Sequence, residues 1–230
     1  MTRKPRRTAL VLTLGALAAV GIGPARADDP VTREPTAIEQ LMVELVNRTR
    51  LDPDGEAQRQ GIDLNEGLNP GRLTNEPREP LAINLFANEA ALLHTKDLFD
   101  NFSNLPPTHR GSDGRDPTSR VQDAGATFFG GVAENNAWIS QSNTRVTDSA
   151  TKTLHRNLFR DFLPNFEVVG RGHRKVMLNG SRNEIGVCVR GGKFGPRTAA
   201  ITTYDMFSSN ALYITGVAIP VDGGMRARNN

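Results

Sequence analysis

Apolar residues recur at helical spacing where the chain's first long element is expected. Within residues 36–53 they lie three and four positions apart and so share one helix face: Ile38, Leu41, Met42, Leu45 and Val46. Thr36 and Glu39 have the spacing of a capping box, in which a hydroxyl and a carboxylate satisfy free N–H groups of the first turn. The pattern predicts an amphipathic helix that Pro53 stops.

Further helices and then strands are expected along the chain. After a Gly-, Asn- and Pro-rich connection, three segments have helical patterns: residues 80–102, 116–125 and 148–162. Three later segments alternate or are rich in β-branched residues, which is typical of strands: residues 184–190, 198–207 and 211–219. Because helices precede strands without βαβ alternation, the sequence predicts an α+β fold.

The N-terminal stretch is distinct from this domain. A basic head, "TRKPRR", precedes the apolar run "TALVLTLGALAAVGIG" and the small-residue site "ARA", a pattern typical of a secretory signal peptide. We therefore expect a signal peptide at 1–27, a disordered lead-in at 28–35, the domain at 36–209 and a strand and tail at 210–230. The expected location is extracellular or periplasmic, with no transmembrane segment after signal removal.

Charge and cysteine content narrow the function further. The whole chain carries a formal charge of +3, but residues 1–27 hold five basic groups and no acidic ones, so the remainder is +3 − 5 = −2. Nucleic acid is therefore not an expected partner. The single cysteine, Cys188, excludes an intrachain disulfide and lies in "IGVCVR", where a buried strand position is expected.

The candidate chemistry rests on histidines and one glutamate. The motifs GxxxxGK[ST], GxSxG and HExxH are absent from the sequence. His94 lies in a helical pattern and is expected to pack at the core edge, whereas His109 lies in the polar loop "THRGSDGR". Glu134, in "GVAENNAW", has small and apolar neighbours, so it is expected to face a cation or N–H donors.

The order of several segments resembles the CAP superfamily, the cysteine-rich secretory, venom allergen and pathogenesis-related group, and most closely its bacterial secreted branch. The segments that carry this resemblance are "ELVNRTRLDP", "PLAINLFANEAALLH", "HRGSDGRDPTSRVQDAG", "ENNAW", "GHRKVML" and "NEIGVCV". They extend from Ile38 to Ser208. Their order is more specific than any one of them.

The resemblance implies an α-β-α sandwich, with a small antiparallel sheet between helical layers, and an open cleft. In this family two histidines and acidic residues line the cleft and in several members hold a divalent metal. Here these positions match His109, Glu134 and His173, and zinc is the expected metal. His109 matches only with a short insertion, because Asn104 follows Phe102 and Ser103 where the family has its histidine.

Two of the site residues have alternative interpretations. The family's second acidic position falls near His155, which could be a third imidazole ligand or could pack beside Phe159. His173 could point into the cleft because Gly170 and Gly172 let the backbone bend, or it could cap or pack at a helix start.

Three functions compete. The first is a secreted binding module, whose His/Glu cleft could hold a divalent metal and which could also bind a lipid or cell-envelope component. The second is a metal- or His/Glu-dependent hydrolase with Glu134 as the candidate catalytic base. The third is an envelope scaffold with a vestigial cleft. No nucleophile is paired with a base in the sequence, so an enzyme is the weaker expectation.

Overall fold

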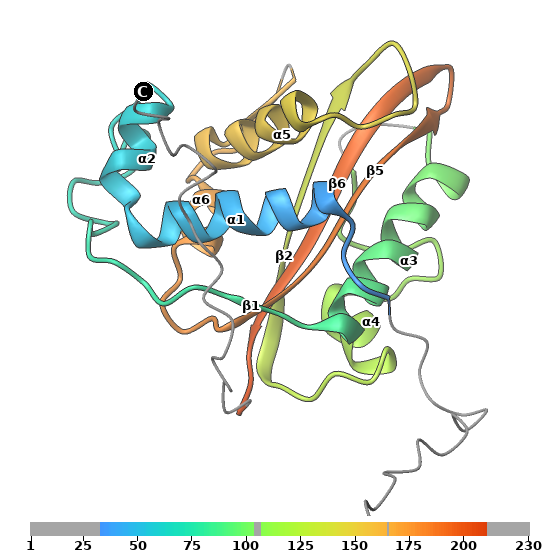
Figure 1. The fold of residues 1–230 in the computed structure, drawn as a ribbon, viewed down its shortest axis with the longest axis horizontal. Coiled ribbons are helices and arrows are strands. Elements are labelled where there is room, and N and C mark those ends of the chain that lie inside the picture. The colour runs from blue at the N-terminus through green and yellow to red at the C-terminus, as the bar shows by residue number, and fades with distance from the viewer. Residues whose placement is uncertain (1–32, 104–106, 165, 211–230) are drawn as a thin grey trace, which may run out of the picture.

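The fold is a sheet between two layers of helices (Figure 1). The computed structural model describes residues 33–103, 107–164 and 166–210. The expected signal peptide at 1–27, most of the expected lead-in at 28–35 and the strand expected at 211–219 lie outside the described residues. The predicted α+β sandwich is confirmed by the arrangement of the described elements.

The central sheet has four strands in the order β1-β5-β6-β2. Their bounds are β1 Ala82–Ile83, β2 Phe129–Ser140, β5 Glu184–Phe194 and β6 Arg197–Ser208. The two long pairings, β2 with β6 and β5 with β6, are antiparallel, and the second of them joins two of the strands that the sequence predicts. The short pairing of β1 with β5 is parallel, which makes the sheet mixed rather than purely antiparallel.

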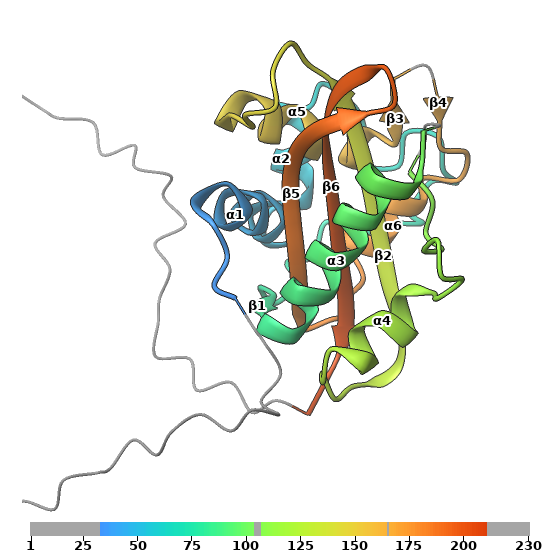
Figure 2. The ribbon, with the colours of Figure 1, turned by 90° about the vertical axis from the view of Figure 1, so that its right-hand side faces the viewer.

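Different helices cover the two faces of this sheet (Figure 2). One face carries α3 (Leu85–Asn101) and α4 (Pro117–Asp123), and the other carries α1 (Ala37–Leu51), α5 (Asp148–Arg160) and α6 (Gly172–Met177). The short helix α2 (Pro53–Arg59) packs on α1, and β3 (Phe162–Leu163) pairs with β4 (Phe166–Glu167) in a separate small sheet. No helix in the described part of the chain is long and apolar enough to cross a membrane.

The predicted first helix is confirmed, but Pro53 does more than end it. Thr36 and Glu39 form both hydrogen bonds of the expected capping box. After α1 ends, the Asp52 carboxylate accepts a hydrogen bond from the Gly55 N–H, and Pro53 becomes the first residue of α2. Proline suits this position because a first-turn N–H has no helical partner to lose. Part of the expected connection is therefore helical.

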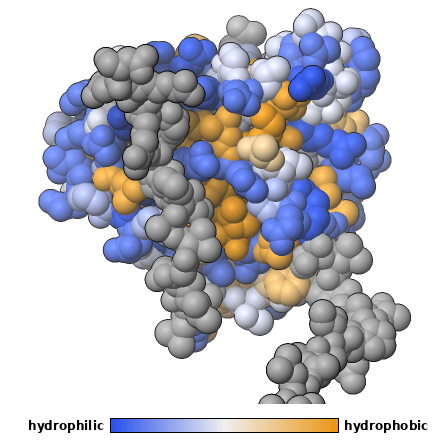
Figure 3. Space-filling model, viewed as in Figure 1, coloured by the Kyte–Doolittle hydropathy of each residue, from blue (hydrophilic) through white to orange (hydrophobic). Residues whose placement is uncertain are grey.

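The core lies on both faces of the sheet. Buried apolar side chains of α1, α5 and α6 pack on one face, with Met42, Leu158 and Met177 fully buried. On the other face α3 approaches β5 so closely that a Cβ on Gly186 would lie 2.1 Å from the Ala87 carbonyl carbon. Hydrophilic residues cover much of the surface in Figure 3, and hydrophobic residues gather near its middle, between α1 and α3.

The strand β2 is not among the strands predicted from the sequence, because "FGGVAENNAWIS" is rich in polar and small residues. Its polar residues are buried and alternate between the faces. Glu134 and Asn136 point toward the α3/α4 side, where they meet groups of α4 and of the loop before it, whereas Asn135 donates hydrogen bonds to the His173 carbonyl and the Tyr204 hydroxyl on the other side. This alternation decides which predicted site residues can meet.

Candidate functional site

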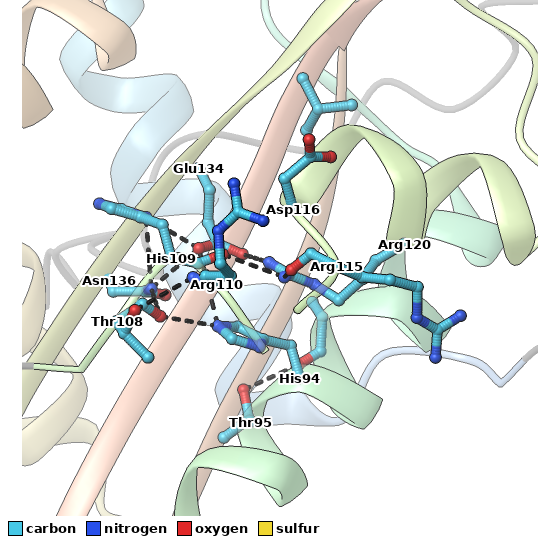
Figure 4. A network of polar contacts seen from close by, with 12 residues as sticks. His94, Thr95, Thr108, His109, Arg110, Arg115, Asp116, Arg120, Glu134 and Asn136 are labelled. Carbon is cyan, nitrogen blue, oxygen red and sulfur yellow. Dashed lines mark hydrogen bonds and ion pairs between the residues drawn. The ribbon is translucent and has the colours of Figure 1, made fainter. Parts of the chain in front are cut away.

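Glu134 is the centre of a polar cluster on the α3/α4 side of the sheet (Figure 4). One carboxylate oxygen, Oε1, accepts from His109 Nδ1 at 2.8 Å and from Asn136 Nδ2 at 2.9 Å. The other oxygen, Oε2, accepts from Arg120 on α4. His94 on α3 lies nearby, with Nε2 3.7 Å from Oε1. The sequence expectation that Glu134 faces cations and N–H donors therefore matches its contacts.

These partners keep Glu134 ionised. Burial alone would raise the pKa of this carboxyl, but the hydrogen bond from His109 and the positive charge of Arg120 outweigh burial and lower the pKa below its usual value. A carboxylate with a lowered pKa is a weak proton acceptor. Glu134 is therefore better suited to orienting its partners than to acting as a general base.

His109 is the exposed member of the cluster. Its side chain is 55% exposed, whereas the Glu134 side chain is 1% exposed. Because the ionised carboxylate can only accept, the bonded Nδ1 carries a proton, and Nε2 is the ring nitrogen that Glu134 leaves unbound. A carboxylate that fixes an imidazole in this way is the arrangement found behind metal-ligating and proton-accepting histidines.

His94 is buried and belongs to the same cluster. Its Nε2 lies 3.0 Å from the Thr108 carbonyl oxygen, which can only accept, so Nε2 carries the proton. Desolvation by burial lowers the pKa of this imidazole, so the ring is neutral near pH 7. Its Nδ1 is therefore a buried acceptor, and it has no partner among the described residues. The sequence predicts only that His94 packs at the core edge, and it does not predict this hydrogen bond to Thr108 or the unpaired Nδ1.

A cavity of about 470 Å³ lies beside the cluster, between α3 and α4. His94 and Arg120 line it, together with apolar groups of Ala90 and Leu93. Arg120 is 7% exposed, and its Nε–H is a second buried group without a partner in the described part of the chain. The cavity wall therefore includes one residue with an unsatisfied donor and one with an unsatisfied acceptor.

Asp205 on β6 is a second buried carboxyl in this region. It stands directly opposite Glu134 in the register of β2 and β6, and it is completely buried. Burial first, and then the charge of Glu134, raises the pKa of Asp205 well above its usual value. Asp205 is therefore a neutral acid beside an ionised one, as expected when two carboxyl groups share a dry site.

His173 lies at the start of α6, on the other face of the sheet. Gly170 and Arg171 have left-handed backbone conformations with φ of 77° and 51°, so the turn uses Arg171 rather than the expected Gly172. The carboxylate of Asp161 accepts hydrogen bonds from the N–H groups of His173 and Arg174 at 3.0 Å each. His173 Nδ1 is 2.8 Å from Asp161 Oδ1. Its partner is thus Asp161 rather than Glu134.

His155 is paired with an acid that sequence reasoning missed. Its Nε2 lies 3.1 Å from Oε1 of Glu56 on α2, and both side chains are buried. The ring also stacks on Phe159, with centroids 6.5 Å apart. Of the two interpretations of His155, packing beside Phe159 is the one that its position supports.

The expected metal ligands are therefore divided among three carboxylates. His109 is with Glu134, His173 with Asp161 and His155 with Glu56. Within residues 33–103, 107–164 and 166–210, no group of three His, Cys, Asp or Glu side chains is placed to hold a metal ion. Both oxygens of Glu134 are already bonded, one of them to a guanidinium. As the side chains lie, they do not fit a resident zinc ion, and zinc binding stays a prediction.

Sequence reasoning finds His109 and Glu134 but misses their neighbours. It assigns His94 to packing and gives Arg120 and Asp205 no role. The sequence does offer a signal for Arg120, because this cation lies in the short helix pattern "DPTSRVQDAG", close after His109 in the chain. Asp205, within the β-branched "TAAITTYDMF", is an acid at a strand position, which calls for an explanation.

The comparisons with known proteins bear on the fold. No family model matches the sequence, and no curated protein does. Among solved structures, an outer surface protein from Borrelia burgdorferi matches with 10% identity and a TM-score of 0.45, over 78% of this chain and 100% of that one. Venom allergen-like protein 4 of Schistosoma mansoni matches with 14% identity and a TM-score of 0.42, over 76% and 92%.

A third match is NaASP2, solved with Zn²⁺, with 14% identity and a TM-score of 0.39, over 73% of this chain and 76% of that one. At such identities the likeness concerns the fold alone and gives no residue of this chain a role. In its fold, the chain is similar to these three solved structures, one of which is a venom allergen-like protein, the kind of protein that its sequence resembles.

Proposed function

We propose that this chain is a CAP-type binding module whose ligand occupies the cavity between α3 and α4. The observation that carries the proposal is the pair of unsatisfied buried groups on residues of the cavity wall, Arg120 Nε–H and His94 Nδ1. A buried polar group without a partner costs about 1–3 kcal/mol. Both atoms are shielded from solvent, so a ligand reaches them only when the Arg120 and His94 side chains shift toward the cavity. A ligand that then supplies both partners recovers this free energy, and the cavity volume is within the range of small-molecule sites.

The two groups also define the chemistry of the ligand. Arg120 Nε–H donates, and the neutral His94 ring accepts at Nδ1. A hydroxyl group both accepts and donates, so an alcohol is the simplest partner for the two. Ala90 and Leu93 offer apolar contacts for the body of such a ligand. A lipid or cell-envelope component with a free hydroxyl is a larger ligand of the same class, and secretion of the chain belongs to the same proposal.

His94→Gln tests this proposal. The glutamine amide can replace Nε2 as the donor to the Thr108 carbonyl, but it removes the acceptor at Nδ1. We expect ligand-observed NMR to detect binding of small alcohols to the wild type, stronger than that of their methyl ethers, and weakened about tenfold in the variant. His155→Gln is the control, because it changes an equally buried histidine on the opposite face. Equal binding of alcohols and ethers would count against the proposal.

Glu134 supports a hydrolase less well. Its lowered pKa makes it a weak base, and no hydrogen bond joins His109 to a serine, threonine or cysteine hydroxyl or thiol in the described residues. Zinc titration of the mature chain beside His109→Ala and His173→Ala tests the predicted metal site. Saturable one-site binding that both variants abolish would require His173 to leave Asp161.

A further inference from the structure

A second pocket, on the opposite side of the sheet, has a different character. It has a volume of about 330 Å³ and lies between α1, α2 and α5. Its lining includes four cations and no carboxylate: Arg48, Arg59, Lys152 and Arg156. The remaining polar lining residues are Gln60, Ser149, Thr153 and His155, all able to donate or accept hydrogen bonds. Three helices thus bring positive charge to one hollow.

Hydrogen bonds to Glu56 hold two of the cations, Arg48 and Arg59, in place. The buried Glu56 carboxylate accepts from Arg48 Nε at 2.9 Å and Nη2 at 3.0 Å, and from Arg59 Nε at 2.9 Å. Arg59 Nη2 reaches Asp52 at 3.4 Å. These bonds leave Nη1 of both arginines without a hydrogen bond to any described residue, so each guanidinium keeps donors free while its position is fixed.

The other two cations have no acidic partner at all in the described residues. Lys152 and Arg156 lie one turn apart on α5, both exposed, and neither side chain makes a hydrogen bond or ion pair with the described residues. Glu56 and Asp52 form ion pairs with two of the four cations, Arg48 and Arg59. Two charges therefore remain uncompensated in a concave site, where fields concentrate and counter-ions gather.

We infer that this pocket between α1, α2 and α5 is an anion site that binds a phosphate group. A phosphate monoester carries close to two negative charges near pH 7 and has three acceptor oxygens. Its charge matches the two uncompensated cations, and its oxygens match the free Nη1 groups and the Lys152 ammonium. The pocket volume leaves room for a small organic body attached to the phosphate, either a soluble metabolite or a lipid headgroup.

Titration of the full mature chain with inorganic phosphate, followed by amide NMR shifts, tests this site. We expect saturable shifts in α5 and α2 that weaken with added salt. Lys152→Gln/Arg156→Gln is expected to weaken binding about tenfold to a hundredfold. The matched control is Lys96→Gln/Arg160→Gln, which removes the same charge from exposed positions outside the pocket and is expected to change binding less than about twofold.

The outcomes are distinct. Equal weakening of phosphate binding in both double variants would show only a general attraction of anions and would contradict a specific site. Absence of saturable phosphate binding to the wild type would overturn the site, unless vesicles that contain phosphatidic acid bind to it. Co-sedimentation with vesicles containing phosphatidic acid, beside vesicles of phosphatidylcholine alone, separates the sources. Pocket-dependent binding to the first vesicles alone assigns the phosphate to a lipid headgroup. Failure in every arm contradicts the inference, and none of these results depends on the α3/α4 cavity.

Discussion

The two faces of the sheet each bury a glutamate that meets a histidine and an arginine. On the α3/α4 face, Glu134 binds His109 and Arg120, and on the other face Glu56 binds His155 and Arg48. Both carboxyl groups have lowered pKa values, although burial alone would raise them. The histidines differ, because the His109 side chain is 55% exposed and that of His155 only 1%.

The difference shows how one combination of residues can have two roles. Glu56 joins α2 to α1 through Arg48 and to α5 through the buried His155, so this histidine serves as a structural link. Glu134 holds a histidine whose second ring nitrogen faces solvent. Residue types alone therefore do not identify the working site, and the exposure of the imidazole separates the two.

Glu56→Gln is expected to have the largest effect on stability. It removes the charge that joins three helices and leaves His155 buried without its acid, so we expect a loss of about 3 kcal/mol at pH 7 in urea unfolding. Because the folded-state pKa of Glu56 is lowered, its contribution is fully present above about pH 4.5 and is lost as pH falls below that value. The variant's deficit should shrink in acid. Glu44→Gln, on the exposed surface of α1, is the control.

His155 and His109 are expected to differ in how much each contributes to the stability of the fold. His155→Ala should cost about 2 kcal/mol, because it removes the stacking on Phe159 and one partner of a buried carboxylate. His109→Ala should cost only about 0.5 kcal/mol, because water can replace an exposed imidazole. Thermal unfolding of both variants measures the contrast. Similar losses of stability in the two variants would contradict the assignment of His155 as a structural link and of His109 as a histidine held at the surface.

Asp205→Asn is expected to stabilise the protein by about 1 kcal/mol at pH 7. The folded-state pKa of Asp205 is raised, so the wild type loses stability as pH rises above the unfolded value near 4. Asparagine is neutral at every pH and similar in shape, which removes this loss. The gain should therefore be larger at pH 7 than at pH 4, and a gain of the same size at both values would contradict the shift.

The helices could be predicted from the sequence because local signals define them. The capping box at Thr36 and Glu39 and the apolar repeat behind it are within one segment. The strand β2 could not, since the polar groups of "ENNAW" are satisfied only by partners far away in sequence, such as Arg120, Thr108 and the carbonyl of His173. The same holds for Glu56, which lies 99 residues from its partner His155.

Two buried arginines illustrate the same limit. Arg50 donates to the carbonyls of Met177 and Asn179, and Arg174 donates to the carbonyls of Phe159 and Leu64. Both are completely buried. Because an arginine in a helical pattern normally indicates an exposed position, nothing local distinguishes these two, and only the folded chain identifies them as anchors for irregular segments.

The most direct measurement is the rate at which diethyl pyrocarbonate modifies each of the four histidines of the folded protein, resolved by mass spectrometry. The reagent needs an accessible ring nitrogen, and the side chain of His109 is largely exposed whereas that of His155 is buried. We expect His109 to react first and His155 to react only when the protein unfolds. Equal rates for the two, or faster reaction of His155, would contradict the assignment of Glu134 as the carboxylate that presents a histidine.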